Sequence, residues 1–396
     1  MSGVERPADG KRVLAAMSGG VDSSVAAALL VEAGFSVVGI TMKLPGDETG
    51  GEGVCCSLEA AEGARQVAAR LGIPHYAVDL RDDFERLVVG PFIADYMRGR
   101  TPNPCVLCNR VIKLGVLWDR ARALECDFVA TGHYARVLCA TGHGGAAGTA
   151  ARTGARATPP EGRGPGEESR RGRYLLWRAR DRRKDQSYVL YRLGQQELGR
   201  LLLPLGHLTK ARVREMARRR GFPTAGRPES QEICFIPGGD YREFLRERLG
   251  DRVFAAGPIV SREGEVLGEH PGLAFFTVGQ RRGLGIRRPG PWYVVEIRPE
   301  ENALVVGRQT DLLGCALEAE EARFIPFDWP PGPLQVEAQV RYRGPALPAV
   351  VTSLGEGRVR VDFREPQRAI APGQAVVFYQ GDLVVGGATI ACTLGD

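Results

Sequence analysis

The chain has 396 residues, of which 43% are hydrophobic and 25% are charged, and its formal net charge is +6. This composition is normal for a soluble globular protein, and the length predicts two or three domains. No apolar run approaches the roughly 20 residues of a membrane span, which excludes a membrane protein.

Two further features bear on the compartment. The N-terminal residues 1–7 lack the apolar core of a secretory signal. The nine cysteines are an odd number in a long chain, which argues against a structural disulfide framework. We therefore expect a cytoplasmic protein whose thiols are reactive or bind metal. The mild positive charge permits a nucleic-acid partner but does not require one.

The first motif is a glycine turn between a strand and a helix. The apolar run 12–16 leads into Met17-Ser18-Gly19-Gly20-Val21-Asp22-Ser23-Ser24, and 25–33 continues as a helix. Such a turn leaves backbone N–H groups unpaired at the positive end of a helix dipole, where phosphate binds. Because the Gly-Lys-Ser/Thr ending of a Walker loop is missing, the turn is typical of enzymes that cleave ATP between the α and β phosphates. The alternative is an ordinary glycine-rich turn with a serine cap.

The rest of the first 135 residues alternates between strands and helices. We predict strands at 36–42, 73–79 and 127–131, and a helix at 58–71 that Ser57 caps and Gly72 ends. Asp82 is expected to cap the next helix. This alternation predicts a doubly wound parallel sheet covered on both faces, with the ligand at the carboxyl ends of the strands.

Residues 140–172 interrupt the pattern. They are rich in glycine, proline and arginine and have almost no large apolar side chains, so they cannot bury enough surface to offset the entropy of ordering. We expect a mobile insertion that is solvated, with a basic tail for RNA as the alternative.

The remainder divides into a helical and a β part. Between 206 and 275 the pattern is helical and basic, and Thr209 is expected to cap an arginine-rich helix that Gly221 ends. We interpret its cations as a solvated face. From about 276 onward, alternating apolar and polar residues separated by turn signals predict a small antiparallel barrel. The expected domains are thus residues 1–205, 206–275 and 276–396.

The cysteines carry the second chemical signal. Cys105 and Cys108 lie in the proline-containing stretch 101–109, and Cys234 stands far along the chain. A Cys-x-x-Cys pair is consistent with zinc ligation, an iron–sulfur ligand pair or a redox dithiol. Zinc is least favoured because no second pair completes the usual spacing. Two inert turn cysteines are a further alternative. The adjacent Cys55 and Cys56 are interpreted as structural or incidental.

The glycine turn at 17–24, the three cysteines and several further segments together resemble one protein family. The chain resembles the bacterial tRNA-specific 2-thiouridylases, a family of pyrophosphate-loop ATPases (the adenine nucleotide alpha hydrolase-like fold). The matching segments cover nearly the whole chain except the insertion. They are 17–23, 39–43, 99–104 with Cys108, 130–134, 184–188, 230–235, 340–343 and 372–374.

The resemblance implies a role for each matching residue. It implies that Cys108 is the catalytic thiol and Cys234 carries a persulfide. The nucleotide would be held by Ala16, Met17, Ser18, Gly19, Gly20, Val21, Asp22, Ser23, Met42 and Gly132. The tRNA would be contacted by Asn103, Pro104, Cys105, His133, Lys184, Asp185, Gln186, Arg341, Tyr342 and Gln374. The basic central domain 206–275, which carries Cys234, and the barrel would bind its phosphate backbone.

The resemblance also implies the reaction and its reagents. ATP would adenylate C2 of the wobble uridine, and sulfur would then replace the oxygen as AMP leaves, with Mg²⁺ balancing the pyrophosphate. The sulfur would come from a cysteine desulfurase or a sulfur-relay protein. The family has an aspartate in its best-known branch where this chain has Cys105. The site therefore has three cysteines, Cys105, Cys108 and Cys234, and three is the number of protein ligands in a [4Fe–4S] cluster with one open iron. The persulfide relay and the cluster both stay open.

Two other classes compete with a thiolase. One is a different pyrophosphate-loop enzyme, such as an amidotransferase-type synthetase or argininosuccinate synthetase, which needs no pair of separated reactive thiols. The other is a non-catalytic RNA-binding protein that uses the barrel and the basic helix. Replacing Cys108 by serine distinguishes the first, because a ligase tolerates it. AMP release distinguishes the second.

Overall fold

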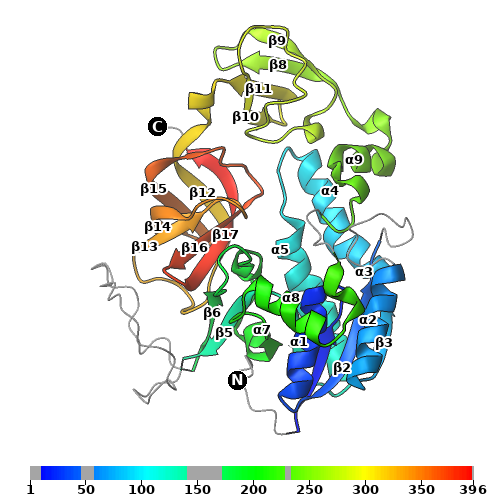
Figure 1. The fold of residues 1–396 in the computed structure, drawn as a ribbon. Helices are drawn as coiled ribbons and strands as arrows, with labels where there is room; N and C mark the ends of the chain where they lie inside the picture. Colours follow the sequence, from blue (N-terminus) through cyan, green and yellow to red (C-terminus); the bar gives the residue numbers. More distant parts are fainter. Residues whose placement is uncertain (1–9, 46–57, 141–171, 228–232, 395–396) are drawn as a thin grey trace.

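The computed structural model describes residues 10–45, 58–140, 172–227 and 233–394. Figure 1 shows a parallel sheet at the N-terminal end of the chain, a small sheet at the opposite end of the molecule and a barrel beside both. The expected insertion at 140–172 falls almost entirely outside the described residues, as do Ser57, Cys55 and Cys56. No helix in the described ranges is both long and apolar enough to cross a membrane.

The N-terminal sheet confirms the doubly wound prediction. Its five strands are all parallel, in the order β3-β2-β1-β4-β7. They are β1 (Arg12–Ala16), β2 (Ser36–Lys43), β3 (His75–Asp79), β4 (Phe128–Ala130) and β7 (Leu201–Leu202). Alternate side chains of β1 enter different cores, Leu14 on one face and Val13 and Ala15 on the other. This period of two is what a strand buried on both faces requires.

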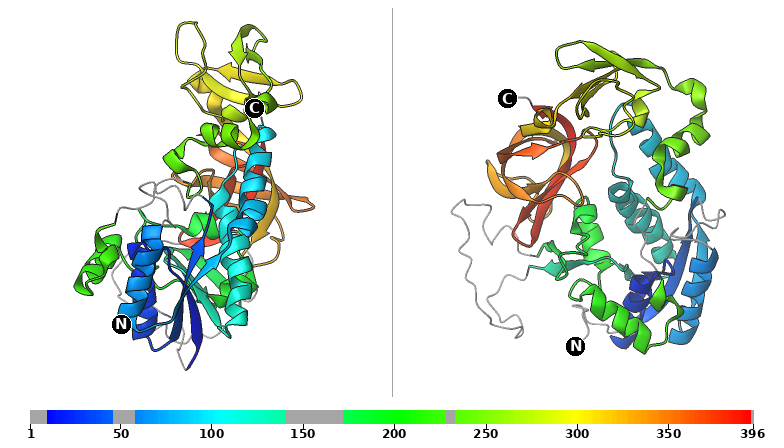
Figure 2. Two further views of the ribbon diagram at one scale, coloured as in Figure 1. Left: turned by 90° about the vertical axis from the view of Figure 1, so that its right-hand side faces the viewer. Right: turned by 45° about the horizontal axis from the view of Figure 1, so that its top comes forward.

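Helices cover both faces of this sheet (Figures 1 and 2). On the face of Val13 lie α1 (Val21–Glu32), α2 (Leu58–Leu71) and α8 (Lys210–Arg219). On the face of Leu14 lie two longer helical runs, α3 (Arg81–Phe84), η2 (Glu85–Val89) and α4 (Gly90–Met97), then α5 (Pro104–Cys108), η3 (Asn109–Val116) and α6 (Leu117–Ala123). The expected cap at Asp82 is wrong, because the helix starts at Arg81 after Leu80.

Each of the two longer runs contains a π-helical section, η2 and η3. In the first, the N–H of the next residue, Gly90, donates to the Glu85 carbonyl oxygen, and Pro91 after it supplies no N–H. A proline inside a helix disturbs the ordinary ladder in this way. In the second, the widening begins at Asn109, immediately after Cys108. Such wide turns are frequent at functional sites.

The remaining helical segments are short. They are η5 (Ser187–Leu190), α7 (Gln195–Arg200), η6 (Pro223–Gly226), η7 (Pro237–Gly239), α9 (Tyr241–Leu249), η8 (Asp251–Val253), η9 (Leu273–Phe275) and η10 (Gln309–Leu312). The expected helical character of 206–275 holds for α8, α9 and the short 3₁₀ turns between and after them. Two strands, β8 (Gly257–Ser261) and β9 (Val266–His270), occupy the end of this range and join β10 (Tyr293–Arg298) and β11 (Ala303–Gly307) in a four-stranded sheet.

The C-terminal part confirms the predicted antiparallel barrel, but the barrel begins at Leu313 and not at about 276, because β10 and β11 join β8 in the four-stranded sheet. The barrel closes in the strand order β12-β15-β14-β13-β16-β17, with β17 pairing back to β12. These strands are β12 (Leu313–Phe324), β13 (Leu334–Gln339), β14 (Leu347–Gly355), β15 (Arg358–Arg368), β16 (Ala375–Gln380) and β17 (Leu383–Leu394). The hairpin of β5 (Ala135–Cys139) and β6 (Tyr174–Arg178) leaves the N-terminal sheet and touches the barrel where Trp177 pairs with Leu383. Closure leaves the barrel without free edges.

Candidate active site

Two glycine-containing loops meet at the carboxyl edge of the parallel sheet. After β1 the chain goes on to β2 on one side of the sheet, whereas after β4 it goes on to β7 on the other side. A topological switch point therefore lies between the neighbouring strands β1 and β4. Ligands bind at such points in open α/β sheets. The loop after β1 is the predicted nucleotide loop, and the loop after β4 carries Gly132. A Cβ added at Gly132 would lie 2.8 Å from the Ser23 nitrogen, so only glycine permits this close approach.

The nucleotide loop has the backbone that its glycines predict. Gly19 has φ +71°, and a Cβ there would lie 2.0 Å from the Ala60 carbonyl oxygen of α2. The Ser18 N–H donates to Ser23 Oγ at 3.1 Å, and Ser24 Oγ donates to the Gly20 carbonyl at 2.8 Å. The serine hydroxyls therefore shape the turn from which α1 begins. The first N–H groups of such a helix have no acceptor within it and attract anions.

The side chains of the predicted nucleotide residues differ in exposure. Ala16–Ser23 run from the end of β1 into α1, and the side chains of Met17 and Met42 are buried. Thr41 Oγ1 donates to the Met17 carbonyl at 2.7 Å, and His75 Nε2 lies 2.9 Å from the same hydroxyl. The Met17 N–H also donates to the Ile40 carbonyl at 2.8 Å, and Met42 pairs with Val78 in the sheet, so both residues are fixed in the floor beneath the nucleotide loop.

Asp22, in the first turn of α1, bonds to a buried cation. Lys210 Nζ lies 2.6 and 2.7 Å from the two carboxylate oxygens, and Tyr134 Oη donates to Asp22 at 2.8 Å. The Lys210 side chain is only 9% exposed. The interpretation of the α8 cations as a solvated face is thus wrong for Lys210. It lies on the same helix face as the buried Val213 and Ala217, and that helical spacing was the signal in the sequence.

Arg227 is a second cation that the sequence did not single out. Its guanidinium donates to the Gly19 carbonyl at 3.1 Å and to the Glu59 carbonyl at 2.7 Å. It thereby joins the nucleotide loop to the first turn of α2. No local motif around Arg227 signals this contact, because its acceptors are backbone atoms far away in the sequence.

His133 connects the Gly132 loop to the helix of Cys108. Its ring is buried, with Nδ1 2.8 Å from Thr131 Oγ1 and Nε2 3.5 Å from Lys113 Nζ. Burial, reinforced by the Lys113 charge, holds the pKa of His133 well below its ordinary value of 6.5. Because an ammonium group can only donate, the neutral ring accepts at Nε2 and donates from Nδ1. In this conformation His133 makes internal contacts, and its approach to RNA stays a prediction.

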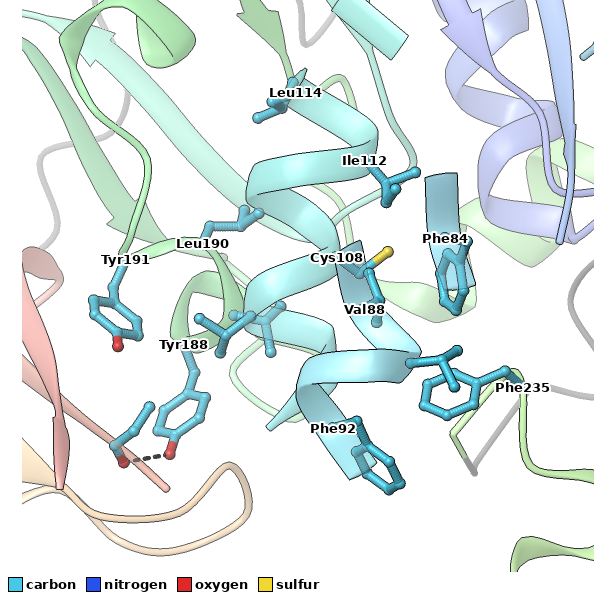
Figure 3. Packing of buried hydrophobic residues seen from close by; sticks show 14 of the residues in the cluster. Phe84, Val88, Phe92, Cys108, Ile112, Leu114, Tyr188, Leu190, Tyr191 and Phe235 are labelled. Atoms are coloured by element: carbon cyan, nitrogen blue, oxygen red, sulfur yellow. Dashed lines mark hydrogen bonds between the residues drawn. The ribbon is translucent and has the colours of Figure 1, made fainter. Parts of the chain in front are cut away.

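The cysteine helix α5 has the start that its sequence predicts. Asn103 Oδ1 accepts from Val106 N–H at 3.4 Å, and Pro104 occupies the first turn. Cys105 is exposed, whereas Cys108 is 8% exposed. Figure 3 shows the Cys108 side chain beside Val88, on the side of the helix where Phe84 also lies.

Cys234 packs against the same hydrophobic cluster. The ring of its neighbour Phe235 lies 5.5 Å from Phe84 and 5.2 Å from Phe92, measured between centroids. Both candidate sulfur carriers thus border one core. Within the described part of the chain, however, no three His, Cys, Asp or Glu side chains form a group that could hold a metal ion. The three cysteines therefore do not fit a cluster in this conformation.

The segment 184–188 is held largely by its own contacts. Asp185 accepts from the Ala179 N–H at 2.8 Å and from Ser187 Oγ at 2.9 Å, and burial raises its pKa. Gln186 Oε1 accepts from the Tyr134 N–H at 2.9 Å. Lys184 is partly exposed. Of the residues predicted to touch tRNA, Asp185 thus ties this segment to Ala179, and Gln186 ties it to the backbone of Tyr134.

The barrel brings the predicted Tyr342 to this region. Its ring lies 5.8 Å from that of Tyr188, and it is 39% exposed. Burial raises its pKa, with further contributions from Asp185 and Cys105, so these residues lie near one another. Arg341 is exposed and donates to the Arg368 carbonyl. Gln374 behaves differently, because it donates to the backbone in front of α5. The geometry thus joins exposed polar groups of the barrel with the exposed thiol of Cys105.

Comparisons with known proteins agree along the chain. Family models match at residues 11–238, described as a tRNA methyl transferase HUP domain, at 242–308, its PRC-barrel domain, and at 316–390, an aminomethyltransferase beta-barrel domain. The tRNA-specific 2-thiouridylase MnmA of Carboxydothermus hydrogenoformans is 49% identical over 96% of this chain and 97% of its own length. That of Moorella thermoacetica is 49% identical over 95% and 98%.

A solved structure shows a more distant likeness. A 4-thiouridine synthetase in complex with RNA and ATP matches 61% of this chain and 51% of its own, at 15% identity and a TM-score of 0.34. A likeness this low bears on neither substrate nor mechanism.

Proposed function

The chain belongs to the tRNA-specific 2-thiouridylase family, and on that premise we propose how its residues share the reaction. As a member it is a tRNA sulfurtransferase that uses ATP. We propose that O2 of the wobble uridine attacks the α-phosphate and pyrophosphate leaves. A sulfur nucleophile then adds to C2, and AMP departs with the former O2. Adenylation is needed because a carbonyl oxygen is a poor leaving group.

The meeting of two loops at the switch point carries the proposal for the first step. The Gly19 turn and the start of α1 offer N–H donors to phosphate, and Gly132 packs on Ser23 at the same edge. Donors fixed before the reaction stabilise charge that develops on the phosphate without reorganising. We propose that ATP enters with Mg²⁺ as part of the substrate and that residues 16–23, Met42 and Gly132 surround it.

For the second step we propose a relay between Cys234 and Cys108, both of which border one hydrophobic core. The Cys108 thiolate attacks the Cys234 sulfur of a persulfide, an S–S bond forms between the two residues, and hydrosulfide is released. The hydrosulfide adds to C2 of the adenylated base. Two electrons from a thiol reductant then restore both cysteines. The persulfide itself would come from a cysteine desulfurase or a sulfur-relay protein.

We propose a tRNA surface that includes the exposed groups around Cys105. Arg341 and Tyr342 of the barrel and the partly exposed Lys184 would contact the RNA, with Asn103, Pro104 and Cys105 next to the target base. His133, Asp185, Gln186 and Gln374 already have protein partners, and these would shape the surface. A base in this site must leave its stack, as in other base-modifying enzymes. The division into residues 1–205, 206–275 and 276–396 likewise stays a proposal.

Reconstitution tests the proposed function. The protein is incubated with ATP, Mg²⁺, a persulfide donor and tRNA that carries an unmodified wobble uridine, and 2-thiouridine and AMP are measured by mass spectrometry. We expect both products in equal amounts, and none of the thiolated nucleoside with Cys108→Ser or Cys234→Ser. Cys139→Ser is the matched control, since Cys139 is exposed on β5. Thiolation that persists without Cys108 and Cys234 contradicts the relay.

Iron and sulfide analysis of anaerobically purified protein separates the relay from the cluster. Colourless protein that is fully active with the persulfide donor supports the relay. Activity that follows iron content contradicts it.

A further inference from the structure

A turn of the C-terminal barrel holds the backbone that leads into the cysteine helix. The Thr101 N–H donates to the Pro372 carbonyl at 2.7 Å. In return, Gln374 Nε2 donates to the Thr101 carbonyl at 2.9 Å and reaches the Pro102 carbonyl at 3.4 Å. These contacts fix the segment 101–102 directly before Asn103, the cap of α5. One exchanged pair of hydrogen bonds thus connects two parts of the chain about 270 residues apart.

The turn itself, residues 372–375, is fixed to the barrel. Gly373 N–H donates to the Ile390 carbonyl at 2.8 Å, and Ile390 N–H donates to the Gln374 carbonyl at 2.8 Å. Gly373 has φ +88°, and a Cβ there would lie 2.9 Å from the Thr101 nitrogen. Glycine is therefore required both for the backbone angle and for the close approach. The turn is a rigid support for Thr101.

The far end of α5 is connected to the same turn by a second path. Tyr188 Oη donates to the Ala375 carbonyl at 2.6 Å. The next residue, Val189, accepts from Asn109 Nδ2 at 3.1 Å. Asn109 directly follows Cys108 and is buried. Residues before the two cysteines of α5 are thus tied directly to residues 372–375, and Asn109 after them is tied there through Val189 and Tyr188.

We propose that Gln374 is a positioning residue for the thiolation reaction. By holding the Thr101 and Pro102 carbonyls, its amide sets the start of α5 and with it the placement of Cys105 and Cys108. The barrel is then part of the framework of the catalytic centre and not only a surface for RNA. This inference rests on the proposed function for its kinetic consequence, but its structural consequence exists in the RNA-free protein.

The test uses Gln374→Glu in the full chain. A carboxylate of the same shape has no donor for the two carbonyl oxygens, so the contact becomes repulsive. Hydrogen exchange of residues 99–108 and the rate of Cys105 alkylation by iodoacetamide are measured without RNA, and kcat and the Kd for tRNA are measured with it. Gln380→Glu is the matched control, because Gln380 also donates to a main-chain carbonyl, that of Gln335, but within the barrel.

We expect exchange and alkylation to rise about tenfold in Gln374→Glu and kcat to fall about tenfold, the size of one hydrogen bond to a buried partner. The Kd for tRNA and the melting temperature should match those of the Gln380→Glu control. A higher Kd with unchanged exchange and alkylation overturns the proposal and leaves an RNA contact only. Unchanged values of all four quantities overturn it as well.

Two further measurements keep the test decisive. If Gln374→Glu melts well below the control, the uncharged Gln374→Leu must give the same rise in exchange and alkylation, and its failure to do so refutes the proposal. If the wild type shows no thiolation, the proposed function fails, whereas exchange and alkylation in the RNA-free protein still decide the role of Gln374.

Discussion

Replacing Gly19 by alanine should damage the nucleotide loop, whereas the same change at Gly20 should hardly affect folding. At Gly19 the backbone has φ +71°, which costs a residue with a side chain about 1–2 kcal/mol. The added Cβ would also lie 2.0 Å from the Ala60 carbonyl oxygen, so the loop or α2 must move by roughly 1 Å. At Gly20 φ is −87° and the nearest atom, Ser18 Oγ, lies 3.6 Å from the Cβ, an ordinary contact.

The two variants are compared by urea unfolding without nucleotide and by AMP formation with saturating tRNA. Strain and overlap together predict that Gly19→Ala lowers the free energy of unfolding by about 3 kcal/mol. Gly20→Ala should stay within about 0.5 kcal/mol of the wild type, since its backbone is already allowed. A loop displaced by roughly 1 Å should also lower kcat/KM for ATP about a hundredfold in Gly19→Ala. Equal losses of stability in both variants would refute the reasoning from backbone conformation.

Two further predictions concern buried ionisable groups. Lys210→Met should lower the free energy of unfolding by about 1–3 kcal/mol, because it leaves the partly exposed Asp22 carboxylate without its cation. The double variant with Asp22→Asn should lose clearly less than the sum of the two single losses. If urea unfolding gives additive losses, the two side chains do not stabilise the fold as a pair. Since burial depresses the pKa of His133, the unfolded chain takes up a proton below about pH 6.5 that the folded protein does not. The free energy of unfolding should therefore fall as the pH drops from about 7 to about 5. In His133→Gln its slope against pH should be smaller, by the equivalent of up to one proton. An unchanged slope in that variant would contradict a neutral, buried ring.

Local features of the sequence were enough to predict the sheet and the nucleotide loop. The turn at Gly19 and Gly20, the strand at 36–42 and the helix at 58–71 each depend on neighbours within a few residues. Hydrophobic alternation in the last third likewise predicted the barrel, because inward and outward side chains alternate along each of its strands. The family followed from motifs spread along the chain, which no single motif identified.

Contacts over long sequence distances were not predictable in this way. The spacing of Lys210 with Val213 and Ala217 could have indicated that its side chain is buried, but only the position of α8 against α1 makes it the partner of Asp22. The strands β8 and β9 escaped notice because they are short and lie among arginine-rich segments. The bonds from the Gln374 amide to the carbonyls of Thr101 and Pro102 were not predictable either, while the RNA contact that the resemblance implies for Gln374 stays a prediction. Burial and pairing across the fold decided each of these cases.

The segment Thr131-Gly132-His133-Tyr134 shows how one short motif can connect three parts of a site. Gly132 packs on the nucleotide loop, and the Tyr134 hydroxyl bonds to Asp22 in the same loop. His133 reaches Lys113 on the helical run of Cys108, while the Tyr134 backbone pairs with Gln186. Direct contacts therefore connect the nucleotide loop to the helical run of Cys108 and to segment 184–188. Gly132 lets the two loops touch, because a Cβ there would lie 2.8 Å from the Ser23 nitrogen. The neutral ring of His133 accepts from Lys113 without placing another charge beside it.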